Sequence, residues 1–156
     1  MTLGGGYMLP SGEGKSLGAI GVGITMKTDG DSTRGAYSMF EYAVPAGVSG
    51  PPLHIHTRED ESFICLDGRL EVTLGDRKFE LVHGDYLLLP RDVPHTFNNP
   101  FDEEARVISV VSPAGLEAYY AALASLPPGP RDIGKMKAIM ADFGLELQLP
   151  PTQPGS

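Results

Sequence analysis

The chain has 156 residues, enough for one domain with a hydrophobic core, and 41% of them are apolar, an ordinary share for a globular protein. Its net charge of −8 excludes a broad nucleic-acid surface or docking on an anionic membrane, because no basic stripe is available to pair with phosphates. One cysteine cannot form an intrachain disulfide, and the Gly-rich start has neither the charged nor the apolar region of a secretory leader. We therefore expect a cytoplasmic protein.

The first third of the chain predicts an arm followed by a hairpin. Residues 1–19 are weakly patterned and indicate an arm or a loosely held first strand. Segments 20–27 and 36–44 read as strands, and the turn formers at 28–32 join them.

Short apolar segments separated by turns continue through the middle of the chain. The twenty glycines and fourteen prolines are spread along the sequence, which favours many short strands over long helices. Asp67-Gly68 is a strong hairpin signal between two of these segments. The predicted strands are 61–66, 69–74, 78–82, 86–89, 95–98 and 105–111. An all-β sandwich, barrel or jelly roll follows from this pattern.

The last part of the chain predicts two helices. Segments 116–126 and 133–143 contain good helix formers, and the prolines of segment 127–130 must separate them. Gly144 fits the position just beyond the second helix, and residues 150–156 predict a ragged end. We expect one domain over 1–156, with an arm at 1–19, a core at about 20–112 and a helical segment at 113–149.

Three of the four histidines and one glutamate form a candidate metal site. His54 and His56 alternate along an extended segment, so both side chains leave the same face. Glu61 lies just past a short connection, and His95 follows Pro94 about thirty residues later. Burying this set needs a reason, and a metal ion bound by three imidazoles and a carboxylate supplies one.

The spacing of these residues resembles the two motifs of the cupin superfamily. The first motif is matched by Gly47, His54, His56, Glu61 and Gly68, and the second by Gly84, Pro90, Asp92, His95 and Asn99. Gly47 lies one residue further from His54 than usual, and Asp92 occupies a position where the pattern has glycine. The resemblance implies a single-domain jelly-roll β-barrel with C-terminal helices that holds one divalent metal ion at His54, His56, Glu61 and His95.

Within that superfamily, segment 50–61 and the run Ser112-Pro113-Ala114-Gly115 are similar to the quercetin 2,3-dioxygenase-like group. This resemblance implies an oxidoreductase, a dioxygenase acting on a small aromatic or enolic metabolite, with Glu61 as metal ligand and catalytic proton acceptor. The donor set suits Fe, Ni, Mn, Zn, Co or Cu. A cyclase, isomerase or lyase that does not use oxygen, and a non-catalytic small-molecule-binding protein, stay open as alternatives. A homodimer is expected by analogy with other cupins.

The remaining candidates have plainer interpretations beside the functional one. Aromatic residues of the predicted strands could line a substrate pocket; they are Phe40, Tyr42, Phe63, Tyr86 and Phe97. Glu59 and Asp60 read as a solvated turn, although either could replace Glu61 as the ligand. His83 reads as a turn residue and Cys65 as buried packing.

Overall fold

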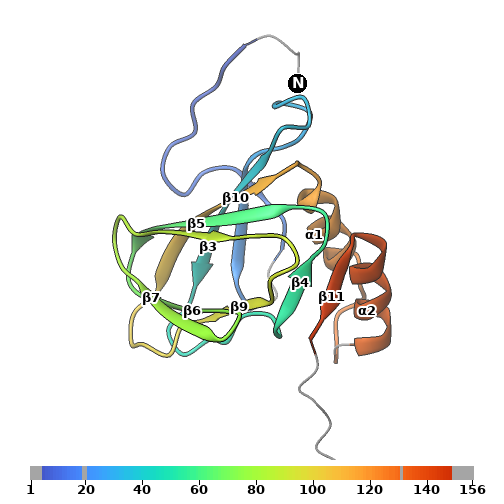
Figure 1. Ribbon diagram of the computed structural model, residues 1–156. Helices are drawn as coiled ribbons and strands as arrows, with labels where there is room; N and C mark the ends of the chain where they lie inside the picture. Colours follow the sequence, from blue (N-terminus) through green and yellow to red (C-terminus); the bar gives the residue numbers. More distant parts are fainter. Residues whose placement is uncertain (1–4, 19–20, 131, 149–156) are drawn as a thin grey trace, which may run out of the picture.

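The computed structural model describes residues 5–18, 21–130 and 132–148, and it consists of two β-sheets and two short helices (Figure 1). The first sheet has the strand order β1-β2-β3-β10-β5-β8, and the second has the order β11-β4-β9-β6-β7. All strand pairs are antiparallel, as the all-β jelly-roll prediction requires, and that prediction is confirmed. The two sheets face each other and enclose the core.

The strands of the first sheet are β1 (Lys15–Ser16), β2 (Gly23–Thr28), β3 (Ser38–Val44), β5 (Asp60–Asp67), β8 (Tyr86–Leu89) and β10 (Ala105–Ser112). Those of the second sheet are β4 (His54–His56), β6 (Leu70–Leu74), β7 (Arg77–Leu81), β9 (His95–Asn98) and β11 (Leu145–Leu147). The helices are α1 (Leu116–Ala124) and α2 (Ile133–Asp142). None of the helices in the described residues is long and apolar enough to cross a membrane.

Period-two alternation explains why these segments form strands with one buried face. In β5 the residues Glu61, Phe63 and Cys65 are buried, while Ile64 between them is exposed. Strand β10 alternates in the same way over its whole length. Successive side chains of a strand point to opposite faces, so one face of the first sheet supplies half of the core.

Gly68 and Gly144 adopt a left-handed conformation at positions where a side chain would collide with neighbouring atoms. Gly68 lies in the turn between β5 and β6 with φ 69°, and an added Cβ there would lie 2.2 Å from the carbonyl oxygen of Glu104. These two strands belong to different sheets and do not pair with each other, so the hairpin predicted at Asp67-Gly68 is wrong. Gly144 follows α2 with φ 73°, as its predicted place beyond the helix requires.

The C-terminal segment contains a strand that the sequence does not predict, in addition to the two predicted helices. Both expected helices are present, but residues 145–147 form strand β11, which pairs with β4 in the register Leu145↔His56 and Leu147↔His54. Figure 1 shows α1, α2 and β11 at one end of the barrel, beside β4. The C-terminal segment therefore completes the second sheet next to the strand that carries two of the candidate ligands.

The N-terminal segment runs across the outside of the first sheet. Tyr7 donates a hydrogen bond from its hydroxyl to the carbonyl of Lys27 at 2.6 Å, and β1 pairs with β2. The start of the arm, the first residue of the 20–27 strand and the ragged end at 150–156 lie outside the described residues. The single-domain boundaries stay a prediction.

Candidate metal centre

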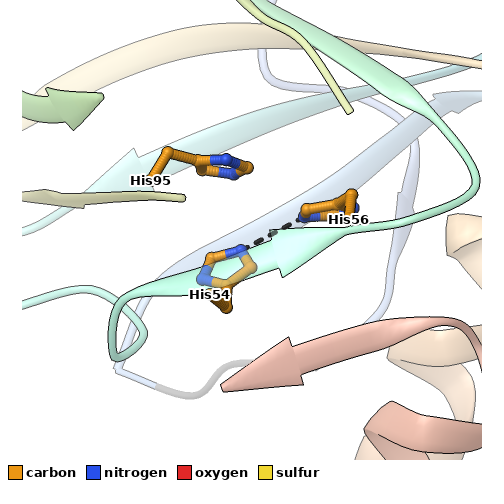
Figure 2. Close-up of side chains that lie close together, drawn as sticks. All are labelled: His54, His56 and His95. Atoms are coloured by element: carbon orange, nitrogen blue, oxygen red, sulfur yellow. Dashed lines mark hydrogen bonds between the residues drawn. The ribbon is translucent and has the colours of Figure 1, made fainter. Parts of the chain in front are cut away.

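The three histidines of the two motifs gather between the sheets. His54 and His56 project from the same face of β4, and His95 begins β9, where it pairs directly with His54. Figure 2 shows the three imidazole rings turned toward one another. One nitrogen of each ring lies within 4.8 Å of the other two, and all three side chains are buried.

The other ring nitrogen of each histidine is occupied by a protein acceptor. His54 Nδ1 lies 2.8 Å from the carbonyl oxygen of Pro52, and His95 Nδ1 lies 3.4 Å from that of Val93. His56 Nδ1 lies 2.7 Å from Oε1 of Glu59. Carbonyl and carboxylate oxygens only accept, so each Nδ1 carries the proton and each Nε2 presents a lone pair to the cluster.

Glu61 approaches this cluster from the opposite sheet. Its Oε2 atom lies 3.6 Å from His56 Nε2 and 3.4 Å from His95 Nε2. Its Oε1 atom accepts hydrogen bonds from Ser109 Oγ at 2.7 Å and from the Tyr42 hydroxyl at 3.4 Å. The two donors fix the carboxylate so that Oε2 faces the imidazoles.

The charge balance of the cluster fits a bound cation. His54 Nε2 and His56 Nε2 are only 3.1 Å apart, and two bare lone pairs at that distance repel unless a proton or a metal ion lies between them. Burial, reinforced by the charges of His95 and His56, lowers the pKa of His54 to about 3, so this ring is neutral. Burial also raises the pKa of Glu61, but the neighbouring histidines and Ser109 outweigh it and bring the value down to about 2, so the carboxylate is ionised. A neutral His54 and an ionised Glu61 are the ligand states that a divalent metal needs.

A large cavity extends from the candidate ligands toward the C-terminal helices. Its volume is about 1060 Å³, and it reaches from His54, His56, Glu61 and His95 to α1, α2 and β11. Its walls are mostly apolar and include Ile24, Phe63, Phe97, Leu123, Met136, Met140 and Leu145. An apolar cavity with a few convergent polar groups is the usual form of a small-molecule site.

Three of the five predicted pocket aromatics line this cavity. Tyr42 and Phe97 lie with their ring planes 19° apart and their centroids at 5.9 Å, and Phe63 meets both edge-on. These three rings form the wall next to the candidate ligands.

The other two aromatics do not line the cavity, so the prediction is wrong for them. Phe40 points inward but is covered by Tyr120 of α1, whose ring meets it edge-on at 5.2 Å. Tyr86 is 62% exposed on the outer face of the first sheet. It pairs with Ile64, which also points outward, and cross-strand partners share a face.

Three residues at the site, Glu59, Ser109 and Tyr120, were not predicted from the sequence. Glu59 is 7% exposed and bonds to His56, so its interpretation as a solvated turn is wrong, whereas Asp60 is half exposed and pairs with Arg91. The only signal for Glu59 is its position three residues after His56. Ser109 and Tyr120 come from β10 and α1, and no motif marks them.

Two further residues match their plainer interpretations. Cys65 is buried in the core. His83 lies away from the cluster, with Nδ1 2.7 Å from the carbonyl oxygen of Leu66.

Fold and site together define a small jelly-roll β-barrel with a buried three-histidine cluster that could hold a metal ion. The family described as "Cupin domain" matches residues 40–111, which span the strands carrying all four candidate ligands. The matched residues 40–111 are therefore a cupin domain, which places this part of the chain in the cupin superfamily.

Individual relatives are similar over parts of the chain. The chain is 36% identical over 93 residues to quercetin 2,3-dioxygenase from Bacillus subtilis, a match covering 58% of this chain and 27% of that protein. It is 40% identical over 60 residues to the polyketide synthase CurC from Streptomyces cyaneus, covering 38% of this chain and 39% of that protein. The chain thus matches less than half the length of either relative. The crystal structure of ectoine synthase from P. lautus is similar with a TM-score of 0.59 at 15% identity, over 90% of this chain and 86% of that one.

Proposed function

We propose that this protein is a metal-dependent cupin enzyme in which His54, His56, His95 and Glu61 hold one divalent metal ion. The observation that carries the proposal is that the Nε2 atoms of all three histidines face one another. Each ring is held in this orientation by an acceptor at its Nδ1 atom. The substrate is a small aromatic or enolic metabolite, and the reaction is a dioxygenation. The partial similarity to quercetin 2,3-dioxygenase supports this choice of reaction.

The residues around the candidate ligands suit a flat, electron-rich substrate. A bound metal would supply Lewis acidity toward a substrate hydroxyl, and a redox-active metal would also allow electrons to reach oxygen. Glu61 is ionised and has its Oε1 atom occupied, so its Oε2 atom can accept the proton of that hydroxyl. Tyr42, Phe63 and Phe97 exclude water and offer ring faces and edges to an aromatic substrate.

A second function keeps the metal and omits oxygen. Three imidazoles and a carboxylate suit Zn as well as Fe or Ni, so the same donor set serves a cyclase, isomerase or lyase that uses the metal only as a Lewis acid. The structural similarity to ectoine synthase covers 90% of this chain, but at 15% identity it supports the fold alone. Cytoplasmic location and a homodimer remain predictions.

The site assignment is tested by the metal content of protein purified without added metal. We expect His54→Ala and His95→Ala to lose most of the metal, because each removes one ligand. His83→Ala is the matched control, since His83 lies away from the cluster, and it should keep the wild-type content. Full metal retention in both ligand variants would refute the assignment.

The reaction is tested by oxygen uptake with a flavonol or a related enol. Stoichiometric uptake that is lost in His95→Ala supports the dioxygenase. Product formation under strict anaerobiosis would instead support the Lewis-acid enzyme, and tight binding without any product would favour a binding protein.

A further inference from the structure

Helix α2 turns one face toward the cavity, and that face carries a lysine. Ile133, Met136, Lys137 and Met140 all line the cavity, at the i, i+3, i+4, i+7 spacing of a single helical face. Three of the four are apolar, as expected for a face that covers an apolar wall. Lys137 is the exception.

Among the described residues that line this cavity, Lys137 brings the only positive side chain apart from the histidines. Within the described part of the chain, no carboxylate lies within 4.0 Å of its ammonium group, whereas Lys135, two residues earlier, has Asp132 at 3.9 Å. Its methylenes can lie along the apolar wall while the ammonium remains hydrated. The cavity thus has the candidate metal site at one end, and the helix α2 that covers the cavity carries a lysine without a carboxylate partner.

A ligand that contacts both the histidine cluster and Lys137 must extend along the cavity. A volume of about 1060 Å³ is at the upper limit of the roughly 300–1,000 Å³ typical of small-molecule sites. A compact ring at the candidate ligands would leave much of this space to water. A second group attached to the ring would reach toward the helices.

We propose that Lys137 binds a carboxylate on the substrate, so that the substrate class is an aromatic or enolic acid. This inference rests on the proposed function, which places the hydroxyl end of the substrate at the histidines. Lys137 is a single point charge, and Gln148 contributes a side-chain amide to the lining of the same cavity. A single cation suits a monoanion, whereas a phosphate group is usually held by several donors or an arginine fork. Because the whole chain carries −8, the charge of Lys137 should favour an anionic ligand over its neutral analogue in this part of the cavity.

Calorimetric titration of the metal-loaded protein with a homologous series of catechol-bearing alkanoic acids, and with their methyl esters, tests the proposal. We expect at least one acid to bind about ten-fold more tightly than its ester, and Lys137→Met to remove that preference while leaving ester binding and metal content unchanged. Lys135→Met is the matched control, because it removes the same charge from the same helix at a residue that does not line this cavity, and it should keep the preference.

The outcomes separate this inference from the function on which it rests. Equal affinity for acid and ester in the wild type, or equal loss of the preference in both lysine variants, overturns the role of Lys137 and leaves the proposed function intact. If neither acid nor ester binds, the proposed substrate end at the histidines fails, and this inference fails with it.

Discussion

Each histidine of the cluster has one ring nitrogen held by a protein acceptor, and only one of these acceptors is charged. His54 and His95 use backbone carbonyls, whereas His56 uses the carboxylate of the buried Glu59. Burial lowers the pKa of His56, but the hydrogen bond and charge of Glu59, together with the charge of Glu61, outweigh it and raise the value. A carboxylate on the far nitrogen also makes an imidazole a stronger metal donor and fixes its orientation.

Replacing Glu59 should therefore weaken metal binding although Glu59 is not a ligand. We expect Glu59→Ala to lower the affinity about 10- to 100-fold, measured by competition with a chelator of known affinity. Glu59→Gln should lie between this variant and the wild type, because it keeps an acceptor and loses the charge. Asp60→Ala is the control, since the half-exposed Asp60 pairs with Arg91 outside the cluster. Wild-type affinity in Glu59→Ala would contradict this role.

Asp92 occupies a backbone conformation that favours glycine. Its φ is 66°, and its N–H donates to the carbonyl of His56 at 2.8 Å, so the loop before β9 is tied to the strand that carries two candidate ligands. The departure from the cupin pattern at this position thus places a side chain in a strained conformation, which Asp tolerates better than most residues.

Asp92→Gly should relieve this strain. We expect the free energy of unfolding to rise by up to about 1 kcal/mol, measured by urea denaturation, because the gain in the folded state exceeds the added freedom of the unfolded chain. Asp92→Ala should destabilise, since alanine lacks the polar group that makes the conformation tolerable. A fall in stability in Asp92→Gly would show that the Asp92 side chain itself contributes.

At the scale of elements, local pattern predicted the strands well and long-range pairing poorly. Alternation and turn residues located the main strands, and motif spacing brought together His54, His56, Glu61 and His95. The residue pattern did not show which face of β8 points inward, and for this reason the prediction that Tyr86 lines the pocket is wrong. Nor could it reveal β11, a three-residue strand whose partner β4 lies about ninety positions earlier. Tyr120, Lys137 and Gln148 enter the site only through that C-terminal segment.

Gly144 is the residue that fastens β11 and α2 to β4. Its carbonyl accepts from the backbone N–H of Thr57 at 2.9 Å and from the Thr57 hydroxyl at 2.6 Å. An added Cβ would lie 2.7 Å from Thr57 Oγ1 and from Arg58 Nε, on a residue that already has φ 73°.

Gly144→Ala should therefore destabilise the protein by about 1–3 kcal/mol, measured by urea denaturation, and should increase amide hydrogen exchange in β11. Gly134→Ala is the matched control: Gly134 lies in the first turn of α2 without a positive φ, and its added methyl group would meet only the Asp132 carboxylate at 3.3 Å. The control should be neutral or slightly stabilising. Equal losses in both variants would refute the anchoring role.

Across the whole molecule, the candidate metal site joins the two sheets, and charged residues secure the outer surface of one of them. The histidines belong to the second sheet and Glu61 to the first, so an ion bound by all four would link them across the core. On the outer face of the first sheet, Glu41 accepts from Arg106 Nε at 2.8 Å and lies 3.0 Å from Lys27 Nζ. Arg106 also donates to Ser11 and Lys27 to the carbonyl of Glu13, so this cluster holds the N-terminal segment against β2, β3 and β10.

This cluster should make stability depend on acidity. Burial raises the pKa of Glu41, but the hydrogen bonds and charges of Arg106 and Lys27 outweigh it and bring the pKa below its usual value of 4.5. A carboxyl group with a lowered pKa in the folded state stabilises fully above its unfolded pKa, and this contribution disappears as the pH falls through the folded pKa. The wild type should therefore lose the contribution of Glu41 below about pH 4.5.

Glu41→Gln isolates that contribution. At pH 7 we expect the variant to be about 1–3 kcal/mol less stable than the wild type, because two charge-assisted hydrogen bonds weaken. The difference should shrink as the pH is lowered through the folded pKa of Glu41, since the wild type then also carries a neutral side chain there. Urea denaturation at a series of pH values measures it. Glu80→Gln, which removes a charge 3.7 Å from Arg69 on the exposed edge of the second sheet, should stay within about 0.5 kcal/mol of the wild type throughout. A gap between Glu41→Gln and the wild type that stays constant with pH would mean that packing at Glu41, and not its charge, secures the N-terminal segment.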